Sequence, residues 1–310
     1  MGYTKRNISF PSSDGINTVH GEIYIPEGER RGIVLISHGM IDYVGRYTLL
    51  AEYLTSRGYI VAGNDHLGHG LTAKCADDYG FFAKKDGYKL VIEDLKSMNR
   101  IVREEYPELS AVLLGHSMGS FMARLYAEKY PETIDGLIIH GTGGKNPLLP
   151  LGKLVIKLTR LFRGDRSRSK LVTSLAFGAY NKRFDPSEGE WAWLTRDIPL
   201  VAGRNSDPHT SFIFTSAGYA DLFRVIGLSN SKAHFKAFPK GLPTLVVSGE
   251  EDPVGDYGRG VRFVHDSLKG AGVENLKLKL YPGARHELFN EINRDEVFAD
   301  LCEWLSSVIG

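Results

Sequence analysis

Short apolar runs of strand length recur along this chain. Most of them lack polar alternation, which is typical of strands that are covered on both faces of a parallel sheet. They lie at residues 32–37, 59–63, 111–114, 136–140, 244–248 and 276–281. Residues 8–25 differ, because they alternate apolar and polar positions around a turn-like Ser-Ser-Asp-Gly at 12–15. That pattern predicts an antiparallel hairpin ahead of the parallel strands.

Stretches with helical periodicity separate most of these runs. They cover residues 47–57, 87–106, 117–130, 257–269 and 291–308. Alternation of buried strands with helices is typical of a parallel sheet that carries helices on both faces. The sequence therefore predicts an α/β fold.

One interval, residues 146–240, interrupts this alternation. It contains no clear buried strand but several helical patterns, and it is too long for a simple loop. We interpret it as a helical cap inserted into the sheet domain, and we call it the cap segment. The expected division is a first core part at 1–145, the cap segment at 146–240 and a second core part at 241–310. A separate helical domain without a role in catalysis is the alternative.

Composition excludes several classes of function. The chain has 310 residues, of which 42% are hydrophobic and 24% charged, and its formal net charge is +1. Such a balance provides no overall field for nucleic acid, so we expect no nucleic-acid partner. Neither a signal peptide nor a membrane span is evident, and the two cysteines do not form a disulfide framework. These features predict a cytoplasmic protein.

A candidate nucleophile lies in Gly115-His116-Ser117-Met118-Gly119. An apolar run precedes this segment directly and a helical pattern follows it, so the expected structure is strand, sharp turn and helix. Glycines on both sides of Ser117 suit a turn in which neighbouring backbone approaches too closely for a Cβ atom. We expect the hydroxyl of Ser117 to project above the sheet, where the backbone N–H of Met118 can stabilise an oxyanion.

A serine nucleophile needs a base and an acid that orients the base. Asp252 follows one late strand and His286 follows the last, so the order along the chain is Ser117, Asp252, His286. Pro253 would end the strand and turn the carboxylate of Asp252 inward. Asp256 is the second candidate for the acid.

The loop after the first parallel strand contains His38-Gly39-Met40 and supplies a candidate second oxyanion donor. Gly39 permits a close approach to the serine, which leaves the backbone N–H of Met40 as the donor. His38 is expected to be buried and hydrogen-bonded. The histidines at 66 and 69 lie among glycines and have no third ligand of matching spacing, so no metal site is predicted.

Together these segments resemble the monoacylglycerol lipase, lysophospholipase and serine-aminopeptidase-like branch of the α/β-hydrolases. Residues 37–39 with 45–47 are similar to its oxyanion loop, 64–70 to its DxxGHG loop, and 115–119 to its GHSMG turn. Residues 249–252 and 281–286 are similar to its acid and histidine turns. The resemblance implies an eight-stranded sheet, a helical cap, no cofactor and ester hydrolysis through an acyl-enzyme. It also favours Asp252 over Asp256.

The cap segment begins with an apolar stripe beside a basic face. Residues 151–170 hold seven basic side chains and one acidic side chain. Helices of this kind rest on anionic lipid headgroups, which suggests peripheral membrane contact, whereas packing of the stripe on the sheet domain is the alternative. Cap aromatics are candidates for lining an acyl channel, namely Phe177, Trp191, Trp193, Phe212 and Phe214.

The predicted activity is hydrolysis of a small acyl ester, with monoacylglycerols or lysophospholipids as the expected substrates. A short-chain carboxylesterase and an aminopeptidase are alternatives. An aminopeptidase requires a carboxylate pair for the substrate amine, and Asp185, Glu188 and Glu190 are the candidates. Acyl transfer to another alcohol, and a catalytically silent binding protein, also remain open.

Overall fold

The computed structural model describes residues 2–309, within which an eight-stranded sheet is the central element. Its strand order is β1-β2-β4-β3-β5-β6-β7-β8. The pairs β1–β2 and β2–β4 are antiparallel and all other pairs are parallel, which confirms the predicted α/β fold and hairpin. The strands are β1 (Tyr3–Pro11), β2 (Thr18–Pro26), β3 (Gly32–Ser37), β4 (Tyr59–Asn64), β5 (Ala111–His116), β6 (Gly136–His140), β7 (Thr244–Gly249) and β8 (Leu276–Tyr281).

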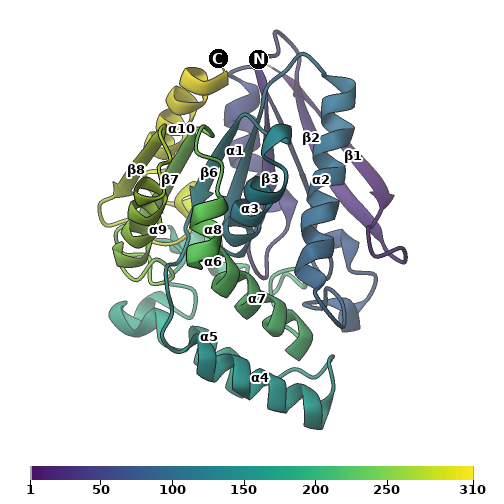
Figure 1. The fold of residues 1–310 in the computed structure, drawn as a ribbon, viewed down its shortest axis with the longest axis vertical. Helices are drawn as coiled ribbons and strands as arrows, with labels where there is room; N and C mark the ends of the chain where they lie inside the picture. Colours follow the sequence, from purple (N-terminus) through teal and green to yellow (C-terminus); the bar gives the residue numbers. More distant parts are fainter. Residues whose placement is uncertain (1, 310) are drawn as a thin grey trace.

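Helices cover both faces of the sheet (Figure 1). Along β3, Val34 and Ile36 pack into one core cluster together with α1 and α10, whereas Ile33 and Leu35 pack into the other with α2, α3 and α9. The side chains of a strand alternate between faces, so β3 contributes to both cores. These helices are α1 (Thr48–Thr55), α2 (Gly87–Glu105), α3 (Met118–Lys129), α9 (Arg259–Gly270) and α10 (Arg294–Ile309).

The parallel register brings the carboxyl ends of the central strands to one edge of the sheet. Ser37 of β3 pairs with Gly115 of β5, and His116 pairs with His140 of β6. Loops that leave β3, β5, β6, β7 and β8 therefore start side by side. This edge is where ligands bind in open α/β sheets.

One predicted boundary and one predicted burial pattern differ from the structure. The helix expected at 257–269 begins at Arg259, because Asp256 and Tyr257 adopt positive φ angles of 52° and 53° that no α-helix contains. The strand expected to be covered on both faces, β8, lies at the edge of the sheet and is half-exposed. Its Leu-Lys-Leu-Lys alternation is the pattern of a strand with one solvated face.

The cap segment consists of helices between β6 and β7. They are α4 (Leu149–Arg163), α5 (Lys170–Phe177), α6 (Ile198–Ala202), α7 (Ser216–Ser229) and α8 (Lys232–Ala237). Helix α7 packs on α3, and α4 packs on α7, so α4 and α5 lie farthest from the sheet (Figure 1). The domain boundaries drawn from the sequence stay a prediction.

Most of the apolar stripe on α4 does not pack on the sheet domain. Ile156 is 2% exposed and packs inward, but Leu161 and Phe162 are 74% and 79% exposed. Other apolar side chains of this region are also exposed, namely Leu148, Leu151, Leu154, Leu158, Leu171 and Leu175. We call these eight exposed residues the apolar face. Among residues 2–309, none of the helices has both the length and the apolar character that crossing a membrane requires.

Candidate active site

Ser117 occupies a tight turn between β5 and α3. Its backbone has φ 52° and ψ −118°, a strained conformation for a residue other than glycine. A Cβ on Gly115 would lie 2.5 Å from the carbonyl oxygen of Gly119, and a Cβ on Gly119 would overlap the carbonyl oxygen of Ser37. Both glycines are thus required by the close approach of neighbouring backbone, as the sequence predicted.

His286 and Asp252 form a buried pair beside this turn. Nδ1 of His286 lies 2.9 Å from Oδ2 of Asp252, and both residues are almost completely buried. Asp252 also accepts hydrogen bonds from Ser248 Oγ at 3.0 Å and from the backbone N–H of Val254 at 2.8 Å. Asp256, the alternative acid, is exposed and pairs with Arg259. The turn after β7 thus directs Asp252 and not Asp256 toward His286.

Met40, Ser117, Met118 and His286 line one cavity of about 620 Å³. Within residues 2–309, neither the backbone N–H of Met40 nor that of Met118 donates a hydrogen bond, so both are free for a ligand. Ser117 Oγ and the His286 ring make no direct hydrogen bond in the described part of the chain, and such contacts often tighten only when substrate is bound. This arrangement can carry out nucleophilic acyl transfer.

The remainder of the cavity wall is largely apolar and comes from the cap segment. Phe177, Trp191, Trp193 and Phe212 line it, as predicted, together with Leu222 and Ile226 of α7. The prediction for Phe214 is wrong. Its ring is fully buried against His69 and Phe82, and it belongs to the hydrophobic core.

Three histidine rings cluster at the loop after β3, where His38 and His66 are stacked and His69 meets them edge-on. His38 is fully buried, faces His66 at a centroid distance of 4.0 Å, and lies 5.1 Å from His69. His38 Nε2 accepts a hydrogen bond from the backbone N–H of His66 at 2.9 Å, so His38 has the structural role that we expected. Among residues 2–309, no group of three His, Cys, Asp or Glu side chains is arranged to hold a metal ion.

Burial changes the titration of several histidines near the site. It lowers the pKa of His69 to about 3, and it lowers the pKa of His66 well below the usual range, with the positive charge of neighbouring histidines adding to the effect. Burial also lowers the pKa of His116 and His140 well below the usual range, and the Nδ1 atoms of these two rings lie 2.8 Å apart. Asp221 shows the opposite effect, because burial raises its pKa to about 7.

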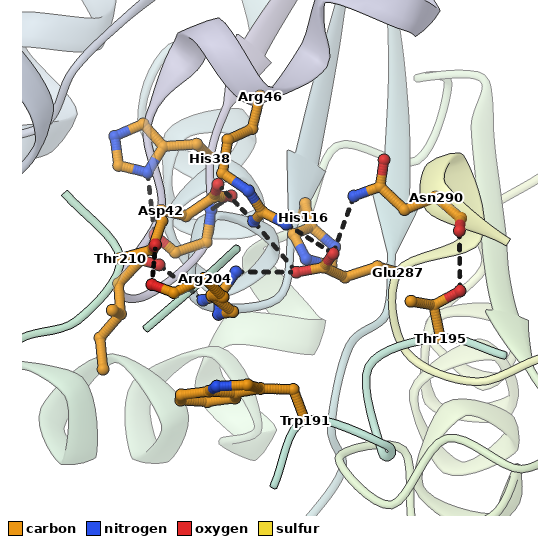
Figure 2. Close-up of polar contacts among 12 residues, drawn as sticks. His38, Asp42, Arg46, His116, Trp191, Thr195, Arg204, Thr210, Glu287 and Asn290 are labelled. Carbon is orange, nitrogen blue, oxygen red and sulfur yellow. Dashed lines mark hydrogen bonds and ion pairs between the residues drawn. The ribbon is translucent and has the colours of Figure 1, made fainter. Parts of the chain in front are cut away.

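Sequence reasoning missed a buried ionic network that connects the loops (Figure 2). Arg46 donates to Asp42 at 2.9 Å and to both carboxylate oxygens of Glu287 at 3.0 and 2.7 Å. Asp42 in turn accepts from the backbone N–H of Gly39 at 3.0 Å. The network therefore connects the loop after β3 with the residue that follows His286. The four-residue spacing of Asp42 and Arg46 is typical of an ion pair, but nothing in the sequence indicated that Glu287 would join it.

The three carboxylates considered for amine binding do not converge. Asp185 is exposed and accepts from the backbone N–H of Ser187. Glu188 pairs with Arg285 at 2.5 Å, and Glu190 is the one that lines the cavity. Together these three side chains do not form the carboxylate pair that an aminopeptidase requires.

The chain is similar to known proteins in both sequence and structure. The pattern of the family described as "Serine aminopeptidase, S33" matches residues 28–293. A monoacylglycerol lipase of Mycolicibacterium smegmatis is 28% identical over 98% of both chains, and a phospholipase of Bacillus subtilis is 25% identical over 86% of this chain and 92% of the relative. A thermostable carboxyl esterase from Bacillus coagulans, solved with glycerol, is 30% identical with a TM-score of 0.92 and 99% coverage of both chains.

The buried histidines predict a loss of stability in mild acid. Below about pH 6.5 the unfolded chain binds protons at these rings whereas the folded chain does not, so their contribution to stability is present above pH 6.5 and is lost as the pH falls. At pH 5 the His69 ring then weakens folding by about 2 kcal/mol, the other three rings act in the same direction, and together they outweigh the opposite effect of Asp221. We therefore expect the melting temperature to decrease as the pH is lowered from 7.5 to 5.

The substitution His69→Gln should make this fall in melting temperature smaller than in the native protein. Thermal unfolding followed by circular dichroism at four pH values measures the effect. A melting temperature that stays constant over this range would contradict the prediction.

Proposed function

Because this chain belongs to the family described as serine aminopeptidase, S33, with the α/β-hydrolase fold, we propose that it hydrolyses lipid carboxylic esters through an acyl-enzyme on Ser117. The observation that carries the proposal is the buried His286–Asp252 pair, whose His286 lines the same cavity as the strained Ser117 and the residues Met40 and Met118. Those elements are the parts that acyl transfer needs.

In the proposed mechanism Ser117 Oγ attacks the ester carbonyl, and His286 accepts the serine proton through Nε2. Asp252 holds Nδ1 of the ring and stabilises the imidazolium. The oxyanion accepts hydrogen bonds from the backbone N–H groups of Met40 and Met118. The imidazolium then protonates the departing alcohol, and water repeats the cycle on the acyl-enzyme.

The proposed substrates are monoacylglycerols or lysophospholipids. A cavity of about 620 Å³ with aromatic and aliphatic cap residues fits one long acyl chain. The names of the relatives, a monoacylglycerol lipase and a phospholipase, point to the same class of ester. Peptide amines are a weaker alternative, because Asp185, Glu188 and Glu190 do not converge.

We further propose that the apolar face contacts membranes or lipid aggregates. Leu161 and Phe162 project from α4 into solvent, and the exposed basic side chains Lys157 and Arg163 lie on the same helix. Exposed apolar side chains with cations beside them favour the surface of an anionic bilayer. This location would place the cap segment where insoluble esters are concentrated.

A substrate panel tests the proposed chemistry. We expect monoacylglycerol or lysophosphatidylcholine to be hydrolysed with a much higher kcat/KM than a prolyl amide. Ser117→Ala should reduce ester turnover by about 10⁴-fold or more, because attack then depends on water alone. Ser206→Ala, at an exposed serine of the cap segment, is the control and should turn over esters like the native protein. Preference for the amide, or full activity in Ser117→Ala, would disprove the proposal.

A matched pair of substitutions tests the proposed acid. Asp252→Asn should lower kcat about 10⁴-fold, because the amide holds His286 in the wrong tautomer. Asp256→Asn removes an equivalent carboxylate four residues away and should leave kcat unchanged. Ester kinetics measure both, and the reverse ranking would assign the role to Asp256.

Vesicle sedimentation tests the membrane contact. The native protein should sediment with anionic phosphatidylglycerol vesicles at low salt. The double substitution Leu161→Glu, Phe162→Glu should weaken this partition by about 100-fold, because it removes apolar burial and adds two charges that the anionic surface repels. Ile16→Glu, at an exposed residue of the hairpin turn, serves as the control. If the native protein stays in the supernatant, the membrane contact is refuted while the ester chemistry is unaffected.

A further inference from the structure

Arg204 is a buried arginine of the cap segment that contacts both loops of the proposed catalytic site (Figure 2). Its Nη2 donates to the carbonyl oxygen of Ile41 at 2.7 Å, and its Nη1 lies 3.4 Å from Oε1 of Glu287. We propose that Arg204 is a positioning residue that holds the loop of Met40 against the loop of His286 and balances the charge between them. This inference rests on the proposed function.

On one side Arg204 supports a strained loop. Ile41 has φ 53°, which is a rare conformation for a β-branched side chain, and it directly follows Met40. Strain of this kind persists only where surrounding contacts over-determine the backbone. The guanidinium bond to the Ile41 carbonyl and the Asp42 bond to the Gly39 N–H hold the chain on both sides of Met40. They therefore fix the direction of the Met40 N–H.

On the other side Arg204 contacts the residue next to the proposed base. Glu287 follows His286, and its backbone N–H donates to the carbonyl oxygen of Leu194 in the cap segment at 2.6 Å. Its carboxylate also accepts from Arg46 and, at 2.8 Å, from Asn290 Nδ2. A shift of Glu287 would move the backbone of His286. Arg204 thus connects the proposed oxyanion donor and the proposed base through one side chain.

The four buried charges balance only when Arg204 is present. Asp42 and Glu287 are negative, and Arg46 and Arg204 are positive. Burial opposes ionisation of Glu287, but the positive charges of Arg46 and Arg204 lower its pKa to about 2, so it is ionised at neutral pH. Without Arg204 the network would carry one net negative charge. That charge would disfavour an oxyanion and favour a protonated imidazole nearby.

Arg204 is itself held in one orientation. The indole of Trp191 lies over its guanidinium at 4.9 Å, and Thr210 Oγ1 donates to its backbone carbonyl at 2.8 Å. Its side chain is 6% exposed, and Nε has no hydrogen-bond partner among residues 2–309. A planar guanidinium can reach Ile41 and Glu287 at once, whereas a lysine ammonium concentrates its charge at one point. Lysine should therefore restore the charge but not both contacts.

The other groups around His286 set the background for a pH test. Asp252 pairs with the ring, His116 lies 4.8 Å from it and Trp193 lies 5.2 Å from it. Glu287 lies on the same loop as His286, just before a 3-10 turn. His140, at the end of β6, is hydrogen-bonded to His116. Asp42 and Arg46 face His116 from the loop after β3 and its 3-10 turn. A substitution at position 204 leaves the identity of all these side chains unchanged, so a shift of the pH profile reports the loss of the Arg204 charge and contacts.

The experiment measures kcat, KM and the pH dependence of kcat/KM for p-nitrophenyl butyrate in Arg204→Met, Arg204→Lys and native protein. For Arg204→Met we expect kcat to fall about 10-fold or more with little change in KM, and the acid-side decline in activity to move to higher pH. For Arg204→Lys we expect the native pH profile with a reduced kcat. Arg166→Met, at a half-exposed cap arginine that pairs with Asp78 and is not among the residues that line the cavity, should behave like the native protein.

A folded Arg204→Met with native kcat and native pH profile would overturn the inference. If Arg204→Met does not fold, Arg204→Lys decides alone: a reduced kcat with the native pH profile supports the inference, and native kcat overturns it. An inactive native protein would instead refute the proposed function, so the two failures are distinguishable.

Discussion

The close approach of the turn at Ser117 to the backbone after β3 is the constraint on which the rest of the site depends. Gly119 lies so near the carbonyl oxygen of Ser37 that no side chain fits between them. Because β3 and β5 are paired in parallel, this contact holds Met40 and Met118 at the same cavity wall as Ser117. The positive φ of Ser117 follows from the same contact, since the chain must reverse direction within one residue to begin α3.

A second constraint comes from charges that are buried away from water. Asp42, Arg46, Glu287 and Arg204 belong to three separate parts of the chain, and the two arginines keep the two buried carboxylates ionised inside the protein. The network therefore makes the cap segment part of the site and more than a cover over it. The exposed apolar face lies mainly on α4 and α5, the helices farthest from the sheet (Figure 1). Phe177 at the end of α5 also lines the cavity, so the cap segment contacts both the site and solvent.

The elements closest to the proposed chemistry were also the easiest to predict. Strand, turn and helix around Ser117 follow from local patterns, and the loops of Asp252 and His286 follow from their positions after buried strands. Arg204 and Glu287 were missed because their contacts join residues far apart in sequence, 163 positions from Ile41 to Arg204 and 241 from Arg46 to Glu287. Phe214 was misassigned for a related reason, since periodicity shows that an aromatic is buried but not which cavity or core surrounds it.

The central claim is that Ser117 is the residue that carries the acyl group. Reaction with a fluorophosphonate, which mimics the tetrahedral intermediate, followed by intact-mass measurement and peptide mapping, tests it most directly. The account predicts one adduct per chain, on the peptide that contains Ser117, and parallel loss of esterase activity as the adduct forms. A hydrolytically active protein that remains unmodified, or an adduct on a different residue that accompanies inactivation, would contradict it.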